Sequence, residues 1–163
     1  MDFSDEQFDK LITCEKEIVQ AQGKPKLERG HYRISFELQS VDKEFYFRAY
    51  GRYNAAFPEN FSVGLVYNPR HEKGSYDIVR CNGPHGEHRM HPHHVYFHIH
   101  KITTTAIESG LKEDCFVEIT DKYATFEDAL RFFVKYIHLK SADIKRHFPG
   151  KNLQTSFLDI EGE

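Results

Sequence analysis

The chain has 163 residues, of which 39% are hydrophobic and 29% charged, and it carries a formal net charge of −3 at pH 7. A chain of this length fits one domain that buries its core without disulfides or a structural metal. Its slightly acidic charge excludes a globally basic nucleic-acid-binding protein, although it leaves room for a local basic patch.

The cysteines and the N-terminus indicate a compartment. Cys14, Cys81 and Cys115 are odd in number and widely spaced, which favours free thiols in a reducing environment. The first residues are acidic and contain no apolar segment of the signal-peptide kind, and no run is apolar enough to span a membrane. We therefore expect a cytoplasmic, bacterial protein that has no membrane association.

A helix is expected over residues 5–21. Ser4 can accept a hydrogen bond from the backbone of the first turn, and Gln7 three residues later completes a capping box. Apolar residues then recur at helical spacing, so one face of this helix should pack on the core. The Gly23-Lys-Pro25 segment should end the helix.

Strand patterns follow this helix. Residues 31–38 and 43–50 alternate between apolar and polar side chains, with a short break between them, and therefore predict a hairpin. In the second of these strands, Phe47 should face the core and Arg48 the opposite side. Further strands are predicted by the patterns at residues 61–68, 76–81, 94–102 and 116–120.

The last part of the chain is expected to be mainly helical. Thr125 can cap a helix that has Asp128 at its third position and an apolar stripe running to about Leu139. A shorter helix is expected at residues 141–147, whereas residues 103–113 fit no single pattern.

Together these elements predict a single α+β domain over residues 1–150. An antiparallel meander of five to six strands should be flanked by an N-terminal and a C-terminal helix. No linker or internal repeat divides the chain, and residues 151–163 are expected to form a loosely held tail.

Seven of the eleven histidines lie within residues 85–100. Imidazole changes charge near neutral pH and is the commonest metal ligand, so this density of histidines predicts a functional site. The segment from Asn82 to Pro84 should open a loop ahead of them, in which Gly83 and Gly86 provide backbone freedom.

If residues 94–102 form a strand, successive side chains point to opposite faces. The core face should carry Val95, Phe97 and Ile99. The opposite face should carry His94, Tyr96, His98 and His100. Neighbouring imidazoles on that face would lie roughly 6.5–7 Å apart, near enough to flank one small group or to bind one metal ion.

Metal-free acid–base catalysis is the first interpretation of the cluster. One neutral imidazole would take a proton and a protonated one would return it, as cleavage of a phosphodiester through attack by a 2′-hydroxyl requires. Strands hold side chains more firmly than loops, so the strand histidines rank first. The candidate catalytic residues are His98, His100, His85, His94 and, to stabilise phosphoryl charge, Arg80.

A divalent-metal site is the second interpretation. A His-x-His pair on a strand and one more histidine can supply three ligands and leave a coordination position open. The expected ligands are His94, His98 and His100, with zinc or another divalent metal as cofactor. Acid–base catalysis, by contrast, would need no cofactor.

Basic and aromatic residues of the second strand could extend the site. Arg48, Tyr50, Arg52 and Tyr53 form a group that could contact phosphates and stack on bases, although an exposed sheet face is the more ordinary role of such residues. The expected substrate-binding residues are Arg48, Arg52, Tyr96 and Lys101. In a third interpretation the histidines are only solvated or hydrogen-bonded, and the aromatic sheet face binds a partner protein.

The histidine segment resembles the centre of TumE-like toxins of bacterial toxin–antitoxin systems. The resemblance rests on Arg80-Cys-Asn82-Gly-Pro84-His85, on Pro92-His93-His94 and on His98-Ile-His100. Strands before this motif and a helix after it extend the resemblance over residues 30–138. By analogy, it implies action on RNA or nucleotides inside the cell, with a cognate inhibitor protein as a partner.

The favoured hypothesis is an RNA- or nucleotide-directed phosphodiesterase of the toxin or phage-conflict type that uses histidine acid–base chemistry. The alternatives are a divalent-metal-binding protein, which as an enzyme would be a metal-dependent hydrolase, and a non-catalytic protein-interaction domain.

Overall fold

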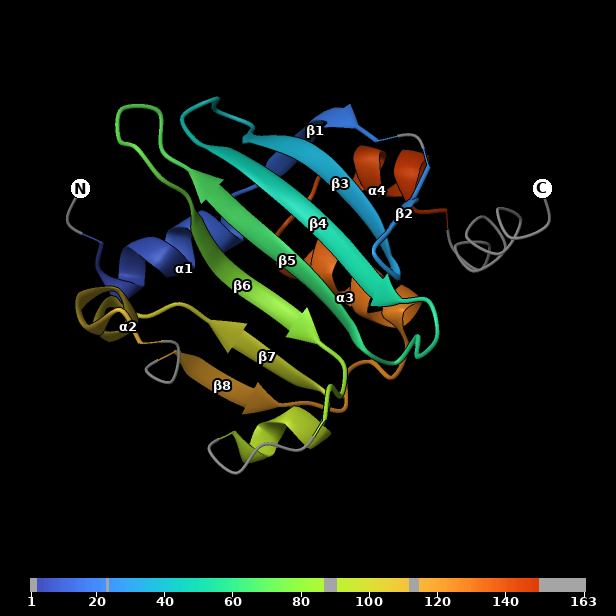
Figure 1. The fold of residues 1–163 in the computed structure, drawn as a ribbon. Helices are drawn as coiled ribbons and strands as arrows, with labels where there is room; N and C mark the ends of the chain where they lie inside the picture. Colours follow the sequence, from blue (N-terminus) through green and yellow to red (C-terminus); the bar gives the residue numbers. More distant parts are fainter. Residues whose placement is uncertain (1–2, 23, 87–90, 112–114, 150–163) are drawn as a thin grey trace.

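The computed structural model describes residues 3–22, 24–86, 91–111 and 115–149 (Figure 1). Its strands are β1 (Lys16–Ala21), β2 (Lys26–Glu28), β3 (His31–Ser40), β4 (Tyr46–Asn54), β5 (Phe61–Asn68), β6 (Tyr76–Asn82), β7 (His98–Lys101) and β8 (Phe116–Ile119). Its helices are α1 (Asp5–Thr13), α2 (Thr104–Ser109), α3 (Phe126–Tyr136), α4 (Ser141–His147) and the 3₁₀ turn η1 (Pro92–Val95). The predicted tail, residues 151–163, lies outside the described residues.

Within the described chain, eight strands form one antiparallel sheet (Figure 1). Seven of them follow the order β1-β3-β4-β5-β6-β7-β8, and β2 pairs with the start of β3. From β3 onward the strands lie side by side in chain order, as a meander requires. The predicted α+β class with helices at both ends is therefore confirmed, although the sheet has more strands than the five to six expected.

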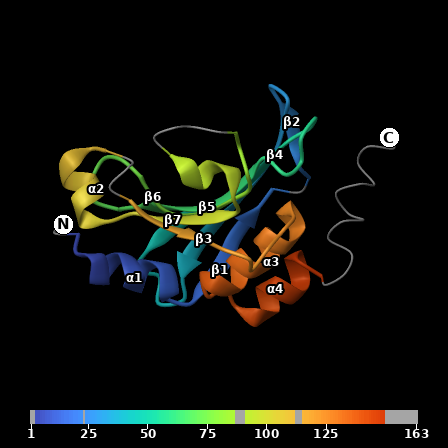
Figure 2. The same cartoon turned by 90° about the horizontal axis from the view of Figure 1, so that it is seen from below.

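The two faces of the sheet have different coverings. Viewed along the sheet, α1, α3 and α4 lie on one side, and η1 lies on the other (Figure 2). We call the side that carries η1 the outer face. Because side chains alternate along each strand, the central strands contribute both to the core beneath the helices and to the outer face.

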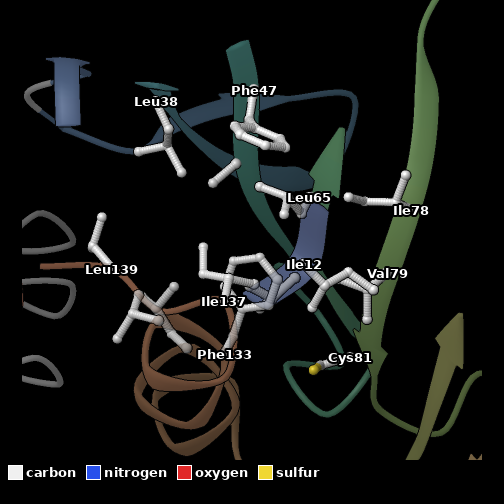
Figure 3. Packing of buried hydrophobic residues seen from close by; sticks show 14 of the residues in the cluster. Ile12, Leu38, Phe47, Leu65, Ile78, Val79, Cys81, Phe133, Ile137 and Leu139 are labelled. Carbon is white, nitrogen blue, oxygen red and sulfur yellow. The ribbon is translucent and has the colours of Figure 1, made fainter. Parts of the chain in front are cut away.

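The core lies between the sheet and the helices. Phe47 and Leu65 from the central strands and Phe133 from α3 are at most 1% exposed and belong to one hydrophobic cluster (Figure 3). Burial of each such side chain contributes on the order of 2 kcal/mol. The predicted alternation in β4 is confirmed, because Phe47 is buried and Arg48 is exposed.

The first helix is shorter than predicted. Ser4 and Gln7 form the expected capping box, but α1 ends at Thr13 and Cys14 is extended, with ψ at 141°. The residues after it leave the helix to form β1, which pairs antiparallel with β3. A helix over residues 5–21 was therefore wrong in its second half, because pairing with a distant strand overrode the local apolar spacing.

Lys16, the first residue of β1, is fully buried. Its Nζ donates hydrogen bonds to the carbonyl oxygens of Ile12 (2.8 Å), Cys14 (2.7 Å) and Ile137 (2.9 Å). These carbonyls lie at the C-terminal ends of α1 and α3, where helices leave acceptors unpaired. Burial lowers the pKa of Lys16 to about 8, so the ammonium form still predominates at pH 7 and joins the two helix ends.

The remaining strand predictions differ in outcome. The hairpin and the strands near residues 61–68, 76–81 and 116–120 are confirmed. A strand over residues 94–102 was wrong at its start, because Pro92–Val95 forms η1 and β7 begins at His98. Val95 is consequently 40% exposed and does not face the core, whereas Ile99 is buried as expected.

The helices after β7 are formed largely as the sequence predicts. Thr125 accepts a hydrogen bond from the backbone of Asp128 and caps α3, whose apolar stripe is buried. The short helix near residues 141–147 is also confirmed, and the unassigned region contains α2. None of the helices in the described ranges is long and apolar enough to cross a membrane.

Candidate functional site

Two rows of side chains cross the outer face. The strand register aligns neighbouring residues, and adjacent strands lie about 4.8 Å apart. The first row contains His98, Asn82, Ser62 and Arg52. The second row contains His100, Arg80, Gly64 and Tyr50. The sheet thus joins the strand histidines to polar and basic residues that are distant in sequence.

His98 is held in one orientation by its neighbours. Its Nδ1 lies 2.7 Å from the carbonyl oxygen of Tyr96, and its Nε2 lies 3.4 Å from the amide nitrogen of Asn82. The amide oxygen of Asn82 accepts a hydrogen bond from the Ser62 hydroxyl at 2.7 Å. Since that amide presents its N–H to the ring and the carbonyl requires a donor, Nδ1 of His98 carries the proton and Nε2 the lone pair.

Tyr123 fixes the backbone beneath this ring. Its buried hydroxyl lies 2.8 Å from the His98 carbonyl oxygen and 3.2 Å from that of Asn82. Burial raises the pKa of the Tyr123 hydroxyl, which therefore stays a donor. The two strands that carry the candidate site are thus tied together from the core side.

Three histidines converge around His98. One ring nitrogen from each of His93, His98 and His100 lies within 4.8 Å of the others. Nε2 of His93 and Nδ1 of His100 are buried and have no hydrogen-bond partner within the described part of the chain. Buried polar atoms normally have a partner, so these two nitrogens are candidate ligand atoms for an ion. We call His93, His98 and His100 the inner triad.

A second group extends the cluster outward. His91, His93 and His94 also present ring nitrogens within 4.8 Å of one another. The ring of His85 lies 4.1 Å from that of His94 and 5.3 Å from that of His98, measured between centroids. Six imidazoles from the loop, η1 and β7 therefore lie together.

The cluster favours neutral imidazoles. Burial, with smaller contributions from Arg80 and the neighbouring histidines, lowers the pKa of His98 to about 4 and that of His100 to about 3. Burial also lowers the pKa of His94 to about 4, and it lowers the pKa values of His85 and His93. At neutral pH these rings therefore offer lone pairs.

These shifts predict how the stability of the metal-free protein depends on pH. In the unfolded chain each imidazole has a pKa near 6.5, so between that value and about 4 the unfolded state binds more protons. The free energy of unfolding should therefore be highest above pH 6.5 and should fall as the pH drops toward 4. Urea titrations with a chelator at pH 7 and pH 5 will measure this loss.

The double variant His98→Gln, His100→Gln is the comparison for this measurement. It keeps polar groups at both positions but has no imidazole to protonate there, so its loss of stability between pH 7 and pH 5 should be smaller. An equal loss in the variant and the parent protein would contradict the assignment.

The cluster forms one side of a pocket of about 700 Å³ on the outer face. The other side is formed by residues from β3, β4, β5, β6 and β8 and from the loop before β5, which include His31, Arg52, Asn60, Ser62, Arg80 and Asn82. No acidic residue lines this pocket in the described ranges. The pocket therefore combines imidazoles, two guanidinium groups and neutral polar groups.

Arg80 is positioned by a neighbouring pair. Its Nε lies 3.6 Å from Asp77, which accepts a hydrogen bond from the hydroxyl of Tyr50 at 2.8 Å. Tyr50 lies over Gly64, where an added Cβ would come within 2.5 Å of its ring. The absence of a side chain at Gly64 therefore allows the contact that supports Arg80.

The predicted site residues divide into two groups. Those that lie at the histidine cluster or in its pocket are His85, His94, His98, His100, Arg52 and Arg80. Arg48 points from β4 beside Tyr50 but does not line the pocket, and Tyr96 is 53% exposed, contributing only its carbonyl. Lys101 lies on the helix side of β7, paired with Asp9 of α1 at 3.1 Å.

Tyr53 also lies apart from the residues with which it was grouped. Its ring packs 5.0 Å from that of Phe126 on the core side, whereas Arg52 faces the pocket. The basic-aromatic group on β4 therefore does not share one face. Alternation along the strand places Tyr53 opposite Arg52.

Asn82 is a site residue that sequence reasoning missed, whereas His93 was named in the resemblance but not among the expected ligands. The expected ligand set contained His94, but the inner triad contains His93, because η1 replaces the expected strand. Pro92 at the start of η1 was an available signal, since proline suits the first position of a helical turn. Asn82 could have been found from its spacing of two residues from Arg80, which places both on one face of β6.

Gly83 has a different role from the flexibility predicted for it. A Cβ there would lie 1.9 Å from the carbonyl oxygen of Glu59 and 2.8 Å from the Phe61 ring. The residue is therefore required by close packing where the chain leaves β6. Gly86, with φ at 97°, does use the left-handed conformation that favours glycine.

No protein-family model matches this chain, and searches of curated proteins and of solved structures returned no significant match. The interpretation of the site therefore rests on its own geometry and chemistry.

Proposed function

We propose that the protein is a divalent-metal-dependent hydrolase whose ion is bound by His93, His98 and His100. The observation that carries this proposal is the inner triad itself, whose three residues each present a ring nitrogen within 4.8 Å of the others, and two of which have a buried ring nitrogen without a partner in the described chain. Three imidazoles and one open position are the usual protein contribution to a catalytic zinc site.

The separations of the ring nitrogens and the hydrogen bond made by His98 fit such an ion. Nitrogen ligands at about 2.1 Å from a tetrahedral ion lie about 3.4 Å apart. Ring nitrogens that already lie within 4.8 Å of one another would therefore need to approach by at most about 1.4 Å. His98 donates from Nδ1 to a backbone carbonyl, the arrangement that orients a metal-binding imidazole. An all-imidazole site favours zinc, cobalt, nickel or copper over magnesium or calcium.

Two of the three triad residues, His93 and His100, line the pocket. A divalent ion there would polarise a bound substrate and activate water for attack. The chain's own contribution is to hold the ligands neutral, to fix the His98 ring and to surround the reacting group with Arg52 and Arg80.

Metal-free acid–base catalysis is the competing function. It requires one imidazole that is protonated near neutral pH. Burial lowers the pKa values of His98 and His100 to about 4 and about 3, which opposes that role. The same shifts keep lone pairs available, so they support ligation of an ion.

Zinc titration tests the proposal. We expect one tightly bound zinc ion per chain in protein purified without an affinity tag, measured by elemental analysis. Zinc at about 100 times its dissociation constant should stabilise the fold by about 2.7 kcal/mol, which corresponds to a rise of roughly 5–10 °C in Tm for a chain of this size. Magnesium should give no such rise.

The control for this titration is His71→Asn. His71 is an exposed histidine in the turn between β5 and β6, away from the cluster, and its replacement should change neither the stoichiometry nor the rise in Tm. A parent protein that contains no zinc and shows no thermal shift with zinc, cobalt, nickel or copper would rule out the proposed function.

A cytoplasmic location is proposed on separate grounds. All three cysteines lie in the described part of the chain, and no disulfide joins them. Burial raises the pKa of Cys81 to about 12, so this thiol stays protonated within the core. Thiols of this kind fit a reducing compartment.

A further inference from the structure

The pocket beside the inner triad is strongly positive when an ion is bound. The ion adds two positive charges, and its three ligands are neutral imidazoles. Arg52 and Arg80 add two guanidinium groups, and Arg80 has a carboxylate neighbour, Asp77, at 3.6 Å. No acidic residue lines the pocket in the described part of a chain whose net charge is nevertheless −3. Such a site requires an anionic ligand.

The two arginines approach the cluster from different strands. Arg80 on β6 pairs in register with His100, and Arg52 on β4 lies in the row that leads through Ser62 and Asn82 to His98. Both line the same pocket as His93 and His100 of the inner triad. An anion in the pocket can therefore contact the ion and two guanidinium groups that reach it from different strands.

Two guanidinium groups beside an ion favour a phosphoryl group over a carboxylate. A carboxylate has two oxygens in one plane, whereas a phosphoryl group presents three in a tetrahedral arrangement. Guanidinium groups match phosphate oxygens with paired N–H donors. A volume of about 700 Å³ is within the range of pockets that enclose a small organic ligand, and so has room for more than the phosphoryl group alone.

We infer that this pocket binds a phosphate ester, with the phosphoryl group bound by Arg52 and Arg80 beside the inner triad. This inference rests on the proposed function, for which it names the substrate class. In the hydrolysis it serves, the oxygen of water forms a bond to phosphorus and the ester P–O bond breaks. The alcohol leaves with a proton from that water.

The test measures binding of four probes to zinc-loaded protein by calorimetry. Inorganic phosphate and adenosine monophosphate should bind, whereas acetate and adenosine should bind at least 10-fold more weakly. The two binding probes distinguish the sources of the phosphoryl group, because tighter binding of the nucleotide shows that the pocket also holds the ester's organic part. Equal binding shows recognition of the phosphoryl group alone, without the ester, and overturns the inference.

Arginine variants identify the groups responsible. Arg52→Gln and Arg80→Gln should each weaken binding of adenosine monophosphate roughly 10-fold to 100-fold, the effect of losing a charge-assisted hydrogen bond. Arg48→Gln is the matched control, because Arg48 lies on the same strand but does not line the pocket. It should change the affinity less than 3-fold.

The outcomes separate this inference from the proposed function. Acetate binding as tightly as phosphate, or equal effects of all three arginine variants, would overturn the phosphate site even if zinc is bound stoichiometrically. If the protein binds no metal but the metal-free chain still binds adenosine monophosphate through Arg52 and Arg80, the hydrolase proposal fails and the phosphate site stands.

Discussion

Replacing His98 with asparagine is expected to weaken zinc binding by roughly 100-fold to 1,000-fold. Structural zinc sites with four ligands have apparent binding free energies of about 10–16 kcal/mol, so one ligand corresponds to about 3–4 kcal/mol. Nδ1 of His98 donates to the Tyr96 carbonyl and fixes the ring, so Nε2 is the atom that would bind the ion, in place of its 3.4 Å contact with the Asn82 amide. Competition with a chromophoric chelator will measure the change in affinity.

His98 is fully buried, so its replacement must be shown not to unfold the chain. Circular dichroism and the Tm measured with a chelator provide that check. His100→Asn provides an independent variant at a half-buried position and should lose affinity to a similar extent. Unchanged zinc affinity in both folded variants would show that the ion, if present, is bound elsewhere.

Lys16→Met is expected to lower the free energy of unfolding by about 3–5 kcal/mol. Methionine nearly matches the length of lysine but has no donor, so the carbonyls of Ile12, Cys14 and Ile137 lose the partner that they share. Leaving buried acceptors unsatisfied costs about 1–3 kcal/mol each, and water reaches some of them after relaxation. The contact between Nζ and the Phe47 ring, at 4.9 Å, is lost as well.

Urea unfolding with a chelator will measure this loss independently of the metal. Lys26→Met is the control, because Lys26 is exposed on β2 and its replacement should change stability by no more than about 0.5 kcal/mol. A loss below about 1 kcal/mol for Lys16→Met would mean that the three carbonyls are satisfied without the ammonium group.

The sequence predicted elements whose signals are local. The capping interactions of Ser4 and Thr125 lie within three residues of the backbone that they stabilise, so both helix starts were found. The hairpin formed by β3 and β4 was found because alternation in both strands agrees with their register. The position of β1 could not be found in this way. Its partner β3 follows it by some twenty residues, and pairing with that strand overrides the helical spacing of the local sequence.

The candidate site was predicted in its location but not in its full membership. The alternation of side chains along β7 correctly placed His98 and His100 on one face. The same alternation places Lys101 with Ile99 on the other face, where it pairs with Asp9. His93 lies in the turn η1, whose position over the sheet depends on the path of the preceding loop. No local period encodes that path, so the choice between His93 and His94 required the three-dimensional structure.

The alternation of side chains between the two faces of the sheet also affects how the sequence can diverge during evolution. From β4 to β7, one set of positions is constrained by packing against the helices, and the alternating set by contacts on the outer face and in the pocket. Substitutions at outward positions such as Arg52 and Arg80 can accumulate without disturbing Phe47 or Leu65. The fold can therefore change its ligand or its metal over evolutionary time while its core sequence is conserved.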